Sequence, residues 1–105
     1  MFEIQVFVPV SDNDGVAFDA GSFEALEAVL CDRFGGFTLF PSPVVGGWRG
    51  PEGRIYRDTL RVYGVWTEAP EVSDAIRATA DYVKTAFRQE AVSVRVPATG
   101  RAEIV

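Results

Sequence analysis

The 105-residue sequence contains no histidine and a single cysteine, Cys31. Histidine is the commonest general base and a frequent zinc ligand, so its absence excludes a Ser-His-Asp triad and most zinc sites. One cysteine cannot form an intrachain disulfide, which is typical of a reducing compartment. Cys31 follows Leu30 in a predicted helix, and we expect it to be a small buried residue rather than a nucleophile. We predict neither a metal nor a cofactor.

The sequence also lacks long apolar runs and has few basic residues. No run approaches the ~20 apolar residues of a membrane-spanning helix, and the first residues lack the features of a signal peptide. Ten basic residues stand against fifteen acidic ones, which gives a net charge of -5. An acidic chain is a poor general nucleic-acid binder. We therefore predict a cytoplasmic protein that binds neither a membrane nor nucleic acid.

The charges are unevenly distributed along the chain. Residues 1–34 contain seven acidic residues and one basic residue, Arg33, whereas residues 35–67 contain four arginines and two acids. An acidic N-terminal surface could dock a basic partner through complementary charge. A regulatory or host-interaction protein is therefore one of the functions that the sequence leaves open.

Hydrophobic periodicity predicts the secondary structure. Apolar residues alternate with polar ones in four segments and recur at helical spacing in two others. In chain order we expect a strand at 2–10, a helix that Asp19 or Ser22 caps and Gly35 ends, strands at 37–45 and 55–67, a helix at 70–87 and a strand at 91–96. The segment 46–54 is too glycine-rich for regular structure. Residues 98–105 form either a short edge strand or a loose tail.

This order, β-α-β-β-α-β, predicts a single α+β domain over residues 1–105 with a ferredoxin-like fold. Right-handed crossovers place both helices on one face of a four-stranded antiparallel sheet. The face beneath the helices should carry the apolar side chains of three strands. These are Ile4, Val6, Val8, Leu60, Val62, Val92 and Val94.

The opposite face of the sheet is the surface on which we expect a function. It combines aromatic rings, arginines and small hydroxyl groups. Its candidate ligand or interface residues are Phe7, Thr38, Phe40, Arg61, Tyr63 and Arg95. Such a surface marks an interface or a ligand site more often than bare solvent contact. We expect either a second copy to cover it, which gives a homodimer, or a small anionic or aromatic ligand to bind there.

Four loop residues are further candidates. Asp12 and Asn13 belong to a turn-forming segment at one end of the sheet, and its spacing does not match a calcium-binding EF-hand loop. Trp48 lies in the glycine-rich segment, where it could act as a lid or as an anchor for a partner. Gln89 follows the second helix and could reach the end of the sheet.

Four short elements resemble a family of small bacterial proteins of unknown function. They are Asp-Asn-x-Gly at 12–15, Arg-Phe-Gly-Gly-x-Thr at 33–38, Gly-Trp at 47–48 and Phe-Arg-Gln-Glu at 87–90. The resemblance spans nearly the whole chain and implies no catalytic residue. The expected layout is also similar to the dimeric ferredoxin-like superfamily, which includes cofactor-free monooxygenases and plain ligand-binding proteins.

From these features we predict a homodimeric, non-catalytic binding or interaction module that uses the open sheet face. A small cofactor-independent enzyme is the first alternative, acting on an anionic or aromatic metabolite in a dimer pocket. The second alternative is the regulatory or host-interaction protein described above. An enclosed polar cavity with convergent groups would favour the enzyme.

Overall fold

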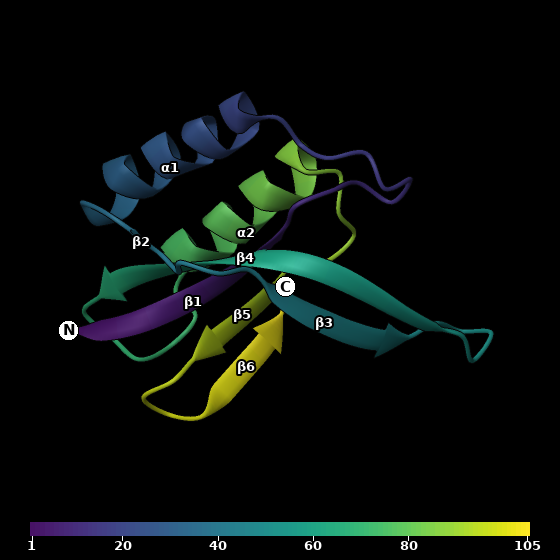
Figure 1. Ribbon diagram of the computed structural model, residues 1–105. Coiled ribbons are helices and arrows are strands. Elements are labelled where there is room, and N and C mark those ends of the chain that lie inside the picture. Colours follow the sequence, from purple (N-terminus) through teal and green to yellow (C-terminus); the bar gives the residue numbers. More distant parts are fainter.

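A six-stranded antiparallel sheet forms one layer of the computed structural model of residues 1–105, and two helices cover one of its faces (Figure 1). The strands are β1 (Phe2–Pro9), β2 (Thr38–Leu39), β3 (Val44–Arg49), β4 (Ile55–Thr67), β5 (Ser93–Val96) and β6 (Arg101–Ile104). The helices are α1 (Ala20–Phe34) and α2 (Asp74–Ala86). The strand order is β2-β4-β1-β5-β6, and β3 pairs with the part of β4 that extends beyond β2.

The class is α+β, as predicted, but the number of strands is not four. The segment 37–45 is divided into β2 and β3 by the stretch that contains Pro41 and Pro43, because proline cannot donate to a strand ladder. The C-terminal residues 101–104 add β6 at the edge of the sheet by pairing with β5. β3 also runs through Gly46 and Gly47 to Arg49, so the first part of the segment expected to be irregular is a strand, while residues 50–54 form the turn.

Each helix begins at a side-chain cap. Asp19 accepts a hydrogen bond from the Ser22 N–H at the start of α1, and Gly35 ends α1 with a left-handed φ of 80°. The second helix begins at Asp74, four residues later than predicted, because Ser73 caps the Ile76 N–H. Neither helix is long and apolar enough to cross a membrane.

The core lies between the sheet and the two helices. Its centre is the fully buried ring of Phe87, which packs against Phe18 and Phe23 with ring centroids 4.9 and 5.3 Å apart. Arg33 donates a hydrogen bond of 3.0 Å to Thr79 and so joins the two helices. The prediction that Cys31 is buried is wrong, since Leu30 takes the inward position of that turn and the Cys31 thiol is exposed.

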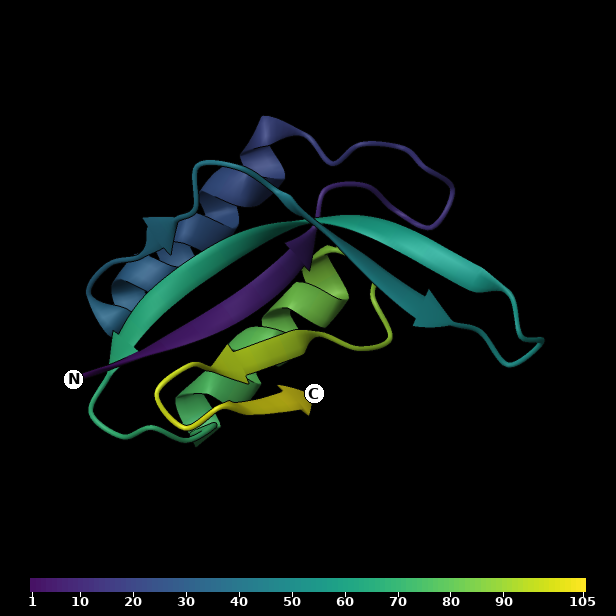
Figure 2. The same ribbon diagram turned by 60° about the horizontal axis from the view of Figure 1, so that its bottom comes forward.

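A two-stranded arm, residues 44–59, extends from the sheet past the end of the helical layer (Figures 1 and 2). We call this hairpin the β-arm. On one side of it the Trp48 and Tyr56 rings stack with centroids 4.7 Å apart, and the indole N–H donates to Asp58 at 3.1 Å. Tyr56 also donates a hydrogen bond to Glu52. This side of the β-arm is therefore held by its own side chains.

Gly50 is expected to be necessary for this packing. A Cβ atom at position 50 would lie 2.6 Å from a ring carbon of Tyr56, whereas one at Gly47 would meet nothing closer than 3.9 Å. Gly50→Ala should therefore displace Tyr56 and abolish the near-ultraviolet circular dichroism of the stacked Trp48–Tyr56 pair. Gly47→Ala is the matched control and should keep that signal. Equal signals from the two variants would contradict the packing described here.

Candidate functional site

A cluster of polar side chains lies between α1 and β4, at the layer where the helices meet the sheet. Glu27 is four residues after Phe23, so both side chains leave the same face of α1. Arg61 and Tyr63 are two residues apart in β4, so their side chains lie on the same face of the sheet and contact Phe23 and Glu27. We call these four residues the Glu27–Tyr63 cluster.

The contacts within this cluster are specific. The buried Tyr63 hydroxyl donates a hydrogen bond to Glu27 Oε2 at 2.7 Å and accepts a long one from Arg61 at 3.4 Å. Arg61 lies 4.0 Å from the same carboxylate oxygen, and its guanidinium carbon is 3.8 Å from the centre of the Phe23 ring. The side chains of Arg61 and Glu27 keep 35% and 25% of their exposure, so the charged end of the cluster is partly exposed to solvent.

Burial raises the pKa of Tyr63 to about 12, and the hydrogen bond to Glu27 adds to this effect. The phenol is therefore a neutral donor across the physiological range and holds the Glu27 carboxylate in place. In the unfolded chain the pKa is about 10, so the folded state binds this proton more tightly. The resulting stabilisation is complete below about pH 10 and is lost as the pH rises through about 12.

We therefore expect the free energy of unfolding to fall between about pH 10 and pH 12, and to fall less steeply in Tyr63→Phe. Urea denaturation at several pH values in this range measures the difference. Tyr82→Phe leaves the Glu27–Tyr63 cluster intact and should show the full decrease. Parallel curves for the two variants would contradict the role of Tyr63.

The prediction that Arg61 and Tyr63 lie on the face without helices is wrong. In the β1–β4 ladder Tyr63 pairs with Val6 and Arg61 pairs with Val8, so both share the helix-covered face with those valines. Leu60 and Val62 consequently lie on the opposite face. Burial of Tyr63 is tolerated because Glu27 accepts its hydroxyl proton in a hydrogen bond.

The other four predicted sheet residues do not join this cluster. Thr38, Gly64, Gln5 and Arg95 are successive partners in one row across the sheet, on the face without helices. On that same face the Arg95 guanidinium lies 4.6 Å from the ring centre of Phe7. Phe7 keeps only 6% of its exposure and Phe40 is half-buried. Thr38 and Arg95 are exposed, so these residues line an open face rather than a closed site.

The four predicted loop residues lie in two places. The Asp12 carboxylate accepts hydrogen bonds from the Asp14 and Val16 N–H groups at 2.9 Å and pairs with Arg88 at 3.3 Å. The Val16 bond is the main reason that the pKa of Asp12 is lowered. Arg88 thus joins the turn after β1 to the turn after α2, where the Gln89 amide donates to a backbone carbonyl. Asn13 is exposed beside Asp12, and Trp48 lies apart on the β-arm.

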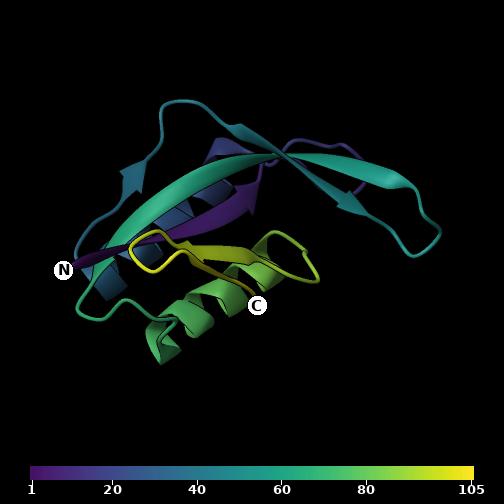
Figure 3. The same cartoon turned by 90° about the horizontal axis from the view of Figure 1, so that it is seen from below.

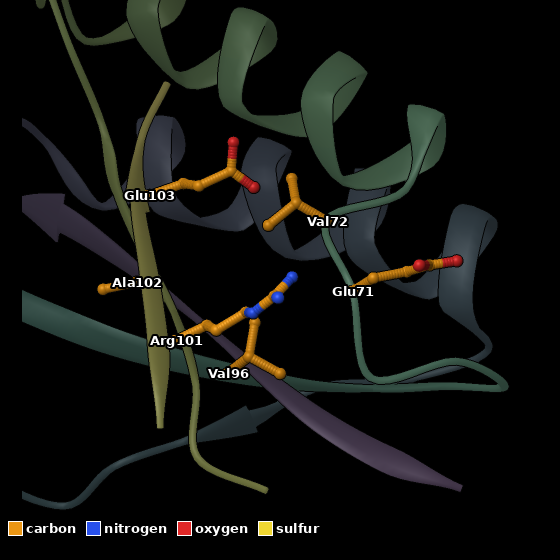
Figure 4. A pocket seen from close by; sticks show the side chains of 6 residues that line it. All are labelled: Glu71, Val72, Val96, Arg101, Ala102 and Glu103. Carbon is orange, nitrogen blue, oxygen red and sulfur yellow. The ribbon is translucent and has the colours of Figure 1, made fainter. Parts of the chain in front are cut away.

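A surface cavity lies elsewhere, between the residues before α2 and the β5–β6 hairpin (Figure 4). Its volume is about 450 Å³, and its lining consists of Glu71, Val72, Val96, Arg101, Ala102 and Glu103. Figure 4 shows Arg101 beside Val72 and Val96, with Glu103 and Glu71 further out. Glu103 is paired with Arg77 at 2.8 Å. Half of the lining residues are exposed, and none of them is a buried titratable group. We therefore take the Glu27–Tyr63 cluster as the candidate site, because there a buried titratable group with a raised pKa is hydrogen-bonded to a carboxylate and lies beside an arginine.

Two members of that cluster, Phe23 and Glu27, are absent from the predicted candidates. An acidic residue next to the apolar stripe of a helix, four residues after an aromatic one, is the signal that could have identified them. No group of three or more histidine, cysteine or acidic side chains is placed so that it could hold a metal ion.

No protein-family model matches the sequence, and no curated protein sequence is significantly similar to it. Two solved structures share the fold. A phage SAM lyase in complex with S-methyl-5'-thioadenosine is 13% identical, with a TM-score of 0.71 over 99% of this chain and 88% of that one. A phage SAM lyase in the apo state is 14% identical, with a TM-score of 0.61 over 98% of this chain and 79% of the other.

These matches overturn the prediction of a non-catalytic binding module. The two solved structures described above are both of an enzyme, and one of them holds a small ligand. That prediction was based on the aromatic residues that the sequence was expected to place on an open sheet face. In the structure that face stays open, but the hydrogen-bonded polar groups Tyr63 and Glu27 lie on the helix-covered side instead.

Proposed function

We propose that this protein is a lyase that cleaves a carbon–sulfur bond of S-adenosylmethionine and releases S-methyl-5'-thioadenosine. The observation that carries the proposal is the match of fold, over 99% of this chain, to the SAM lyase bound to that thioether. The Glu27–Tyr63 cluster supports it, because it offers a partly open site of fixed, charged and aromatic groups.

This reaction suits a chain without histidine. The sulfonium sulfur takes the electron pair of the broken bond and leaves as a neutral thioether, so the leaving group needs no proton donor. The carbon that sulfur leaves can bond to an oxygen of the substrate's own carboxylate, which closes a cyclic ester without any proton transfer. Alternatively, the adjacent carbon can lose a proton to solvent and form an alkene. Neither route adds water to the product.

The environment of the cluster also suits the loss of a positive charge. The sulfonium charge disappears in the transition state, so an unbalanced carboxylate beside the sulfur would stabilise the substrate more than the transition state. Arg61 offsets the charge of Glu27. Phe23 lies against Arg61, and the Phe37 ring lies 5.8 Å from that of Tyr63, so the surroundings are of low polarity.

Each polar residue has a role in this proposal. Glu27 accepts hydrogen bonds from the ribose hydroxyls, and Tyr63 holds its carboxylate in the required orientation. Arg61 binds the substrate carboxylate. The net charge of -5 attracts the substrate, which carries a net positive charge.

The test is to incubate the purified protein with S-adenosylmethionine and to follow the products by liquid chromatography and mass spectrometry. We expect S-methyl-5'-thioadenosine to form in proportion to protein concentration, above the spontaneous breakdown seen with heat-denatured protein. The two possible four-carbon products, a cyclic ester and an alkene, are isomers with the same mass. Chromatographic retention and the fragmentation pattern together distinguish them. Thioether formation at the rate of the denatured control would overturn the proposal.

We further infer that the fold is ferredoxin-like with β6 added at one edge. The order β2-β4-β1-β5 and the two helices on one face support this inference. The resemblance to a family of small bacterial proteins stays a prediction, as do the cytoplasmic location and the homodimer.

A further inference from the structure

The β5–β6 hairpin forms one wall of the surface cavity beside α2. Figures 1 and 3 show this hairpin at the edge of the sheet, next to α2. In the ladder Arg101 pairs with Val96. Glu103 pairs with Val94, and both valines are buried beneath the helices. Cross-strand partners share a face, so Arg101 and Glu103 lie on the helix side of the hairpin rather than on the open side of the sheet.

Only one of the two acidic residues that line this cavity has a partner. Glu103 pairs with Arg77 of α2 at 2.8 Å, and this contact joins the helix to the hairpin. The carboxylate of Glu71 and the guanidinium of Arg101 form no ion pair and no side-chain hydrogen bond. Figure 4 shows Glu71 and Glu103 on opposite sides of the cavity. The cavity therefore presents one uncompensated positive charge and one uncompensated negative charge.

The lining near these charges is apolar. Val96 keeps only 1% of its exposure, and Val72 is half-buried where the chain enters α2. The cavity volume of about 450 Å³ lies within the range of about 300–1,000 Å³ that is usual for small-ligand sites. Two branched aliphatic side chains favour an aliphatic group over a polar one. The cavity therefore suits a small ligand that carries both charges and an aliphatic group.

We propose that this cavity binds a free α-amino acid with an aliphatic side chain, such as leucine. The carboxylate of the ligand pairs with the planar guanidinium of Arg101, its ammonium group pairs with Glu71, and its side chain packs on the two valines. A ligand with only a carboxylate leaves Glu71 unpaired, and a ligand with only an ammonium group leaves Arg101 unpaired. The cavity therefore selects the zwitterion. This inference does not depend on the proposed lyase activity, because the cavity shares no residue with the Glu27–Tyr63 cluster.

Titration of the protein with L-leucine, followed by nuclear magnetic resonance, tests the site. We expect a Kd of about 1 mM or lower, and shifts of the amide resonances of Val72, Val96 and Ala102. Isoamylamine lacks the carboxyl group of leucine and isocaproate lacks its amino group, so each should bind at least about tenfold more weakly. The absence of shifts at these amides, or an analogue that binds as tightly as L-leucine, would overturn the proposal.

Variants of the two unpaired residues separate their contributions. Arg101→Gln and Glu71→Gln each remove one charge from an exposed side chain, and each should weaken L-leucine binding at least about tenfold. Arg95→Gln is the matched control for arginine, because Arg95 belongs to the same hairpin but pairs with Gln5 on the open face of the sheet. Glu90→Gln, in the turn after α2, is the control for glutamate, and both controls should bind like wild type. Wild-type affinity in Arg101→Gln or Glu71→Gln would show that the ligand is held elsewhere.

Discussion

Replacing Phe87 with alanine is expected to lower the free energy of unfolding by about 3–5 kcal/mol, the range for loss of a buried phenylalanine. Phe87 is fully buried where α2 ends, and its ring contacts those of Phe18 and Phe23. These three rings join the turn after β1, the first helix and the second helix. The cavity left by alanine would therefore weaken three segments together. Urea denaturation followed by far-ultraviolet circular dichroism measures the loss.

Phe87→Leu is the matched control for this prediction. Leucine keeps most of the apolar volume, so we expect a loss of about 1–2 kcal/mol. Equal losses in the two variants would show that ring packing is not what matters at this position. A loss below about 1 kcal/mol in Phe87→Ala would show that the three rings do not form the centre of the core.

The proposed lyase activity predicts a large decrease in kcat/KM when Glu27 is replaced. Glu27→Gln keeps the size of the side chain and an acceptor for the Tyr63 hydroxyl but removes the negative charge. We expect kcat/KM for S-methyl-5'-thioadenosine release to fall about 10- to 100-fold, because the charge-assisted hydrogen bonds from the ribose hydroxyls to Glu27 would be lost. The measurement is kcat/KM for S-adenosylmethionine from product formation.

Glu24→Gln is the control for Glu27→Gln. It changes the same residue type on the same helix, but Glu24 is on the exposed side. We expect its kcat/KM to match that of wild type, because the exposed Glu24 makes no contact with the Glu27–Tyr63 cluster. Similar activities in Glu27→Gln and wild type would move the reaction away from the Glu27–Tyr63 cluster, even if the protein is a lyase.

Local patterns predicted most of the fold. The alternating residues of β1 and the helical spacing of Phe23, Leu26 and Leu30 depend on neighbours within a few residues, and both elements formed as expected. The predicted number of strands was wrong at two segments whose local sequence only weakly indicates a strand, and where pairing with a neighbouring strand determines the structure. β3 contains two glycines and β6 is only four residues long, yet each forms a ladder with a neighbouring strand. Tertiary pairing overrides local propensity at such places.

The candidate site was harder to predict, because it depends on which face of β4 points inward. Both faces of this strand carry apolar residues, and Val62, Tyr63 and Val65 are all buried. The sequence favoured Leu60 and Val62 as inward residues because they are aliphatic. The register with β1 placed Tyr63 inward instead, where Glu27 satisfies its hydroxyl. Successive residues of a strand point to opposite faces, so an error of one residue in the inward set exchanges the two faces. Arg61 shares its face with Tyr63 and is therefore also on the helix-covered side.

The β1–β4 ladder has a consequence for folding speed. It joins eight residue pairs, from Pro9 with Leu60 to Phe2 with Thr67, so its partners are 51 to 65 residues apart in the chain. Only the β3–β4 and β5–β6 hairpins can form locally. The entropic cost of closing a long loop must be met before the central ladder contributes any stability. We therefore expect the hairpins and helices to form early and the pairing of β1 with β4 to limit the folding rate.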